Sequence, residues 1–456
     1  MQTCEMNPLL IIHATATALC ICMAAPVLAQ SQDDQQARAE SALIDGNPQA
    51  AIAMTQDILS EQPATFAPLF LKALAHFELG QHRQAATAAS AAFPLAVTQQ
   101  DRRRAAQLAG NAWKSVGAYQ RAAFWLRRAA QHAESSDAWQ AIASSYQQLR
   151  AENPLSLSIG GWIAPTDNIN RGAENETFQL EGLPFDFILP PERVALSGIE
   201  YAVELGATYR LSQTPIQRTT VGLAAFGQTY TLSSEAQVLA PDAEGGDFSF
   251  AAVDLSALHE RLILDGQGPS TIGINVGQIW SAGEPTWRYA SLSLGQEFRP
   301  NTATATGIRL AHTRQTPIDT DVADVKISEI AGSISHRLQN GDAFTTSLTY
   351  IHSDGGFENV FTEFKGDIEY AWAQPVIGVS ISATAGLGNR NYDTFPTTLD
   401  GRRDRFGHVG LQAVINGISY WGFSPSVSVE ANRTISSAEE FTSSSVHARI
   451  GVQSNF

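Results

Sequence analysis

The chain has 456 residues, of which 44% are hydrophobic and 16% are charged. Its length suggests two or three domains. No run of about 18 or more apolar residues follows residue 30, which excludes a protein that crosses a membrane by helices. The formal net charge is −16, and so acidic a chain is unsuited to nucleic acid, which binds positive surfaces.

The first residues have the pattern of a secretory signal peptide. The stretch from Leu9 to Ala18 is apolar, and Val27-Leu28-Ala29 forms a small-residue cleavage pattern before Gln30. The usual basic residues near the start are missing, so translation could begin at Met1 or Met6. We predict that residues 1–29 are a signal peptide and that the mature chain is exported.

All three cysteines, Cys4, Cys20 and Cys22, lie in this removable segment. The mature chain therefore has no thiol, which excludes disulfides, thiolate catalysis and cysteine metal sites. This usage suits a protein that passes through an oxidising compartment.

Two regions of different composition follow. Residues 32–152 carry 11 acidic and 11 basic side chains, whereas residues 153–456 carry 33 acidic and 18 basic ones. The first region is rich in Ala at helical spacing, and the second alternates with a period of two. We predict a helical domain over residues 30–151 and a β domain over residues 152–456, an α+β multidomain fold.

The helical region repeats. The segments "GNPQAAI", "GQHRQAA" and "GAYQRAA" begin at Gly46, Gly80 and Gly117, with their paired alanines in register. The spacings of 34 and 37 residues resemble the tetratricopeptide (TPR) repeat, whose period is 34. We predict an α-solenoid of about three TPR-like repeats, whose concave face would bind a peptide or protein.

Fourteen alternating segments follow Pro154. We expect strands near 155–164, 197–211, 217–231, 247–260, 270–281, 286–298, 303–314, 325–338, 342–354, 361–372, 376–390, 403–415, 418–433 and 444–456. Many run for 10 to 14 residues, about the length that crosses a bilayer at a tilt. A soluble β-sandwich also alternates, but its strands average five or six residues.

Aromatic residues gather at the ends of these segments, as an interfacial girdle requires. They include Trp280, Trp287, Tyr289, Trp372 and Tyr420. The even strand number suits a transmembrane antiparallel β-barrel of the bacterial outer membrane. Short links such as those at Ser212 and Gln339 alternate with long ones such as residues 165–196. Short turns face the periplasm, which places the helical domain there as well.

No catalytic constellation is present. The ten histidines are scattered, and the chain has no HExxH, GxSxG or phosphate-loop motif. We therefore expect no enzyme activity, no cofactor and no metal site.

Charged residues within strands should face the lumen, because an Arg facing lipid at the midplane costs about 2–4 kcal/mol. The candidates are Arg210, Arg288, Arg309, Glu430 and Arg449. In the last strand, Val446, Ala448, Ile450 and Val452 would then face lipid. The spacing of these residues does not distinguish an open pore from a plugged scaffold.

Two local motifs resemble the surface lipoprotein assembly modulator (Slam) family. The first strand leads into "GWIAPTDNINRG", in which Pro165, Asn168, Ile169 and Asn170 match the element that opens the family's barrel domain. Near the end, "DGRRDRFGHVGL", with Arg402, Arg403 and Asp404, followed by "GFSPSVSVEANRTISS", is similar to its last strands. The order of signal peptide, TPR-like repeats and barrel is also similar.

This resemblance implies an outer-membrane translocon that moves lipoproteins or related secreted proteins from the periplasm to the cell surface. The repeats would contact the client or a periplasmic chaperone, and the barrel would provide the passage. The other partners would be the barrel assembly machinery and outer-membrane lipid. A passive or selective porin with a periplasmic docking module is the alternative, and a scaffold for polymer export is a third possibility.

The terminal residue generates a first prediction. Phe456 resembles the aromatic ending that outer-membrane barrels present to the assembly machinery. Deleting Phe456 should therefore lower the amount of assembled barrel in cells while leaving folding into detergent micelles unchanged, as measured by heat-dependent gel mobility. Equal losses in cells and in detergent would contradict an assembly signal.

Overall fold

The computed structural model describes residues 34–454 except 180–184, 319–321, 357–358, 399 and 416–422. The predicted signal peptide and Phe456 lie outside these residues. The chain divides into two compact units between Asn153 and Pro154, and each is considered by itself.

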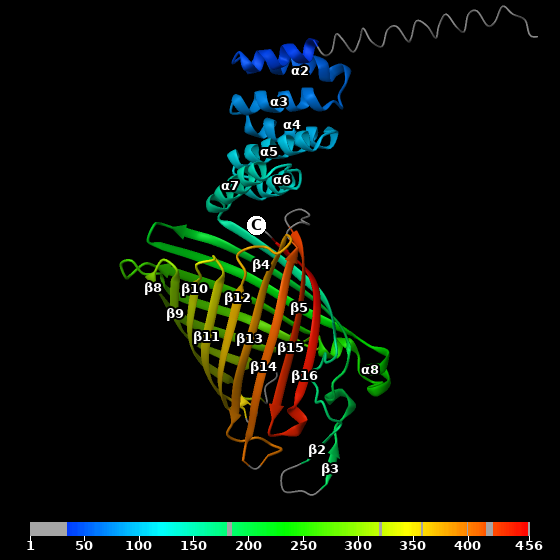
Figure 1. The fold of residues 1–456 in the computed structure, drawn as a ribbon, viewed down its shortest axis with the longest axis vertical. Helices are drawn as coiled ribbons and strands as arrows, with labels where there is room; N and C mark the ends of the chain where they lie inside the picture. Colours follow the sequence, from blue (N-terminus) through cyan, green and yellow to red (C-terminus); the bar gives the residue numbers. More distant parts are fainter. Residues whose placement is uncertain are drawn as a thin grey trace, which may run out of the picture. The chain divides into compact units, whose positions relative to one another are not determined.

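The first unit is a series of helices joined by short turns (Figure 1). Its helices are residues 34–44, α2 (Pro48–Glu61), α3 (Phe66–Glu78), α4 (His82–Ala92), the 3₁₀ turn η2 (Phe93–Leu95), α5 (Gln99–Ser115), α6 (Tyr119–Gln131) and α7 (Ser136–Glu152). These are three helix pairs followed by a closing helix, as predicted for three TPR-like repeats.

The repeated glycines end one helix of each pair. Gly46, Gly80 and Gly117 have φ values of 75°, 70° and 72°, a backbone region that side chains with a Cβ rarely adopt. Gly110 has a different purpose, because a Cβ there would lie 2.8 Å from Cγ of Leu126. Gly110 thus lets α5 and α6 approach closely.

Small side chains fill the space between the helices. Ala51, Ala85, Ala86 and Ala122 are completely buried. They are four of the six repeated alanines of the sequence motif, so the repeat largely preserves the positions at which helices touch.

The second unit is a closed antiparallel barrel of fourteen strands in the described residues (Figure 1). The strands are β1 (Leu155–Thr166), β4 (Gly198–Gln213), β5 (Gln217–Leu232), β6 (Phe250–Arg261), β7 (Ser270–Ser281), β8 (Glu284–Asn301), β9 (Thr304–Pro317), β10 (Val325–Arg337), β11 (Ala343–Asp354), β12 (Phe361–Ala371), β13 (Val379–Tyr392), β14 (Arg402–Ile415), β15 (Phe423–Ser436) and β16 (Ser443–Ser454). The predicted fold class is confirmed, with every strand near its expected place.

Two features of the long loops were not predicted. A small hairpin of β2 (Thr177–Gln179) and β3 (Asp186–Ile188) lies in the loop between β1 and β4, and helix α8 (Ser234–Leu239) lies between β5 and β6. Short 3₁₀ turns η3 (Pro191–Arg193) and η4 (Gly245–Phe248) lie in the same two loops, and η6 (Glu439–Phe441) lies between β15 and β16. The sequences of these segments lack the period-two alternation from which the barrel strands were predicted.

One face of every barrel strand carries large exposed apolar side chains. Examples are Ile159, Leu205, Leu294, Leu348 and Val429, which are between 48% and 56% exposed. The alternate positions carry Gly, Ser, Thr and charged residues. Apolar-out and polar-in alternation is the pattern of a barrel surrounded by lipid.

The two ends of the barrel differ. β1 begins and β16 ends at the end where short turns join β4 to β5, β8 to β9 and β10 to β11. The opposite end carries the longest loops, from β1 to β4 and from β5 to β6. Each end has an exception: a tight turn at Ala282 and Gly283 joins β7 to β8 at the long-loop end, and residues 262–269 link β6 to β7 at the short-turn end. The chain therefore enters the barrel at its short-turn end.

No helix in the described part of the chain is long and apolar enough to cross a membrane.

The helical unit contains a pH-sensitive position. Nδ1 of His132 lies 2.5 Å from Oε1 of Gln99, and burial, followed by the nearby charges of Arg102 and Arg128, lowers the pKa of His132 from 6.5. The unfolded chain then binds the proton more readily than the folded one, so stability present above pH 6.5 is lost as the pH falls.

We expect the helical unit of the full-length protein in detergent to melt at a lower temperature at pH 5.5 than at pH 7.5, as followed by circular dichroism at 222 nm. The His132→Gln variant should lose part of this pH dependence. An unchanged difference between the two pH values in that variant would assign the effect to other groups.

Candidate functional site

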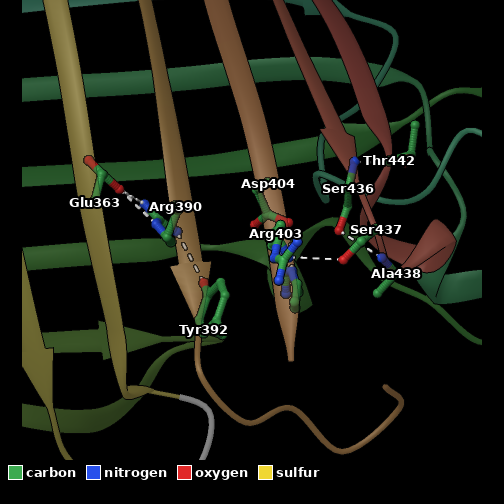
Figure 2. Close-up of polar contacts among 10 residues, drawn as sticks. Glu363, Arg390, Tyr392, Arg403, Asp404, Ser436, Ser437, Ala438 and Thr442 are labelled. Atoms are coloured by element: carbon green, nitrogen blue, oxygen red, sulfur yellow. Dashed lines mark hydrogen bonds and ion pairs between the residues drawn. The ribbon is translucent and has the colours of Figure 1, made fainter. Parts of the chain in front are cut away.

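The inner face of the barrel carries ion pairs between neighbouring strands. Nη1 of Arg309 on β9 lies 2.9 Å from Oε1 of Glu329 on β10. Arg390 on β13 contacts Glu363 on β12 at 2.5 Å, and Glu363 is only 4% exposed. Figure 2 shows this pair, with Tyr392 beside Arg390. The wall is polar, and most of its charge is locally compensated.

The sequence placed five charged residues in the lumen, and the structure brings two of these together. Nη1 of Arg449 on β16 lies 3.1 Å from Oε2 of Glu430 on β15. Arg309 is on another part of the wall, with Glu329. Arg210 is on the inward-facing side of β4 near its end, where it donates to Gln213 at 2.7 Å.

Arg288 requires a correction. It has the parity of Leu292 and Leu294, which are exposed on the outer face of β8, and it pairs with Gln278 of β7. Tyr289, expected in the outer aromatic girdle, instead faces inward over Gly277. Arg288 lies only four residues after the strand begins, where an outward Arg costs about 0–1 kcal/mol. The midplane cost that predicted an inward Arg288 does not apply at this depth.

The junction of β1 and β16, called the seam below, is the place where the first and last strands close the barrel. Among the described residues, four pairs join them, namely Gly161 with Val452, Trp162 with Gly451, Ile163 with Ile450, and Thr166 with His447. By contrast, β1 forms twelve pairs with β4, and β16 forms twelve with β15. Pro165 interrupts the seam because it has no N–H to donate.

Trp162 lies on the inner side of the seam. Its indole N–H donates to Oε1 of Glu200 on β4 at 2.5 Å. The Arg449 guanidinium lies 5.7 Å from the centre of the Trp162 ring, within reach of a cation–π interaction. Sequence reasoning missed Trp162 and Glu200, because their contact depends on the pairing register of two strands.

The Pro165 to Asn170 motif organises the first long loop beside the seam. Asn168, which is 3% exposed, accepts a hydrogen bond from the N–H of Gly172 and donates to the carbonyl groups of Gly172 and Ser444. The bond to Ser444 reaches β16. Asp167 adds a second bond, which it accepts from the N–H of Val446 at 2.8 Å.

Asn170 and Ile169 act within the loop itself. Asn170 donates to the carbonyl groups of Glu192 and Val194 and accepts from the N–H of Leu196. Ile169 is buried in a cluster with Leu196, Tyr230 and the alanines around α8. The motif residues thus hold the loop in one shape and attach it to the barrel.

The second motif forms a separate cluster at the long-loop end. Arg402 binds Asp404 through two hydrogen bonds of 2.8 and 2.7 Å. Its guanidinium also lies 3.5 Å from the ring centre of Phe441 and 5.0 Å from that of Phe395. Arg403 faces outward, and its N–H donates to the hydroxyl of Ser437 (Figure 2). These contacts tie two long loops together.

The arrangement is suited to closing and positioning a barrel. Across the described ranges, no group of three or more His, Cys, Asp or Glu side chains could hold a metal ion. The polar contacts described above join neighbouring strands or loops.

Asn168 provides a test of the seam. Because three hydrogen bonds end on its buried side chain, Asn168→Ala should destabilise the barrel by about 2–3 kcal/mol. It should also speed hydrogen exchange at residues 443–446. Asn170→Ala is the matched control, since it loosens the loop without removing a bond to β16. Equal exchange at residues 443–446 in both variants would contradict a specific role of Asn168 at the seam.

No family model matches the chain, and no curated protein matches it. Several solved structures resemble parts of it. The Sgt2 TPR domain from Aspergillus fumigatus is 22% identical over 26% of this chain and 79% of that chain, with a TM-score of 0.24. The N-terminal domain of stress-induced protein-1 from C. elegans is 14% identical over 26% of this chain and 92% of that chain, with a TM-score of 0.24. A loop-deletion mutant of OmpT, an outer membrane protein of Vibrio cholerae, is 11% identical over 66% of this chain and 99% of that chain, with a TM-score of 0.32. These similarities are too low to assign a function, and we base the proposal below on the geometry.

Proposed function

We propose that this protein is an outer-membrane translocon that delivers lipoproteins or related secreted proteins from the periplasm to the cell surface. The observation that carries the proposal is the direct connection of a repeat domain to the short-turn end of a closed barrel. Only two residues separate the end of α7 at Glu152 from the start of β1 at Leu155. A domain connected in this way is suited to collecting a client at the barrel's periplasmic side.

The loop lengths support the orientation that we propose. Outer-membrane barrels have short turns on the periplasmic side and longer loops outside. Because Leu155 is at the short-turn end, the helical domain is in the periplasm. Residues 165–196 and the other long loops are then at the cell surface.

The repeat domain has exposed apolar side chains that suit a protein client or a periplasmic chaperone. They include Val97, Phe124 and Trp139, which are 89%, 38% and 51% exposed. Exposed aromatic side chains commonly anchor bound proteins. The proposal involves no catalytic residue, cofactor or nucleic acid, and its other partners are the barrel assembly machinery and membrane lipid.

A porin is the second candidate. The inner face carries charged residues in contact with water, such as Arg309, whose side chain is 52% exposed. A porin would conduct ions steadily in a planar bilayer, whereas a translocon would be closed most of the time and change the surface exposure of its client.

Two measurements in cells test the proposal. Protease added to intact cells should cut within residues 165–196 and spare residues 34–150, and the reverse pattern would overturn the orientation. Deleting the protein should reduce surface display of at least one lipoprotein by about tenfold, as measured by protease accessibility of labelled lipoproteins. Unchanged display of every lipoprotein, with reduced uptake of small solutes, would favour the porin.

A further inference from the structure

The seam between β1 and β16 is incomplete at one end. Gln453 and Ser454 pair with Ser424 and Phe423 of β15, yet neither pairs with β1. The register that joins Gly161 to Val452 would place Gly160 opposite Gln453. In the part of the chain that the structure describes, the two strands therefore separate just beyond Gly161, toward the short-turn end.

The other end of the seam is fastened by side chains. Asn168 and Asp167 bond to Ser444 and to Val446 of β16, as described above. Glu174 of the first loop also forms an ion pair with Arg433 of β15 at 2.8 Å. All of these contacts are at the long-loop end of the seam.

Within the barrel, the strong polar contacts stop at the seam. Trp162 donates to Glu200 on the β4 side, and Arg449 contacts Glu430 on the β15 side. Of these groups, only the ring of Trp162 and the guanidinium of Arg449 face each other across the seam, at 5.7 Å. Parting the strands here breaks the few backbone pairs of the seam and separates a ring from a cation, but leaves the side-chain ion pair and hydrogen bond in place.

An apolar groove of about 770 Å³ adjoins the seam on the outer face. Its lining includes Ile159, Ile163, Tyr201, Val203, Trp280 and Val452. Small residues form much of its floor, because Gly161 of β1, Gly227 of β5 and Ala251 of β6 occupy the same face, with Val203 of β4 between the first two. The groove thus begins at β16 and runs across β1 and β4 to β6.

We propose that the seam opens sideways from its short-turn end and that the adjoining groove accepts the acyl chains of a client lipoprotein during transfer. The inference rests on the proposed function and specifies its route. A lipid-anchored client has a polar body and apolar chains, and these need different surroundings. An open seam lets the body pass along the polar wall while the chains stay on the apolar outer face, which is exposed only to hydrocarbon.

A reversible lock tests the opening. Ile163 and Ile450 are direct partners across the seam and both are exposed outward, so the double variant Ile163→Cys with Ile450→Cys can form a disulfide in a mature chain without other thiols. Leu411→Cys with Val429→Cys is the matched control, since this pair is equally opposed across β14 and β15.

We expect oxidation of the seam variant to reduce lipoprotein display by about tenfold and a reductant to restore it in the same cells. The control variant should keep its display in both states. Restoration by the reductant also shows that the variant is folded. Display that stays within twofold of the control while the seam disulfide is formed would overturn the sideways opening, even where deletion of the protein abolishes display. Unchanged display after deletion would instead overturn the proposed function.

The groove has a separate test. Cells are fed an alkyne-tagged palmitate, which labels lipoproteins and phospholipids, and a photoreactive amino acid replaces Ala251 in the groove. Illumination should produce a tagged product whose gel mobility is shifted by the mass of a lipoprotein. The same amino acid at Leu294, outward on β8 but not among the groove residues, should yield phospholipid products alone. Only phospholipid products at Ala251 would show that the groove holds bulk membrane lipid and would overturn the acyl-chain assignment.

Discussion

Closure of the sheet is the constraint on which the rest of this structure depends. Backbone N–H and C=O groups cannot remain unpaired in hydrocarbon, so a membrane-spanning sheet must return to its first strand. The chain meets this requirement by pairing β1 with β16, which are at opposite ends of the β domain. The hydrogen bond from Asn168 to Ser444 joins residues 276 positions apart. Such contacts are slow to form and have to be reinforced by side chains.

The polar inner wall follows from the same constraint. Once the outer face is apolar, charged residues within strands point inward, and neighbouring strands place opposite charges together, as with Arg390 and Glu363. Glycines make room for the larger inward side chains. A Cβ at Gly386 would lie 2.3 Å from the ring of His408, and one at Gly388 would lie 2.5 Å from that of Phe406. The wall is thus packed as well as charged.

The long-loop end is ordered by a few side chains from distant parts of the chain. Arg402 lies against Phe395 of one loop and Phe441 of another, and the N–H of Glu174 donates to the carbonyl of Thr442. The loops that follow β1, β13 and β15 therefore support one another around the long-loop end of the seam. Toward the short turns, the described pairing of β1 with β16 stops at Gly161, so the two ends of the seam differ.

The sequence alone determined the helical repeats, the fourteen strands and the side-chain alternation, because each depends on a local period of about 34, two or 3.6 residues. It also identified Asn168 and Asn170, although without their partners. Only the tertiary structure decided which strand edges meet and at what register. The inward position of Tyr289, the outward position of Arg288 and the contact of Trp162 with Glu200 all depend on that register. A local period specifies that side chains alternate. Near a bulge or a strand end, the face on which a residue lies depends instead on the distant strands that pair with it.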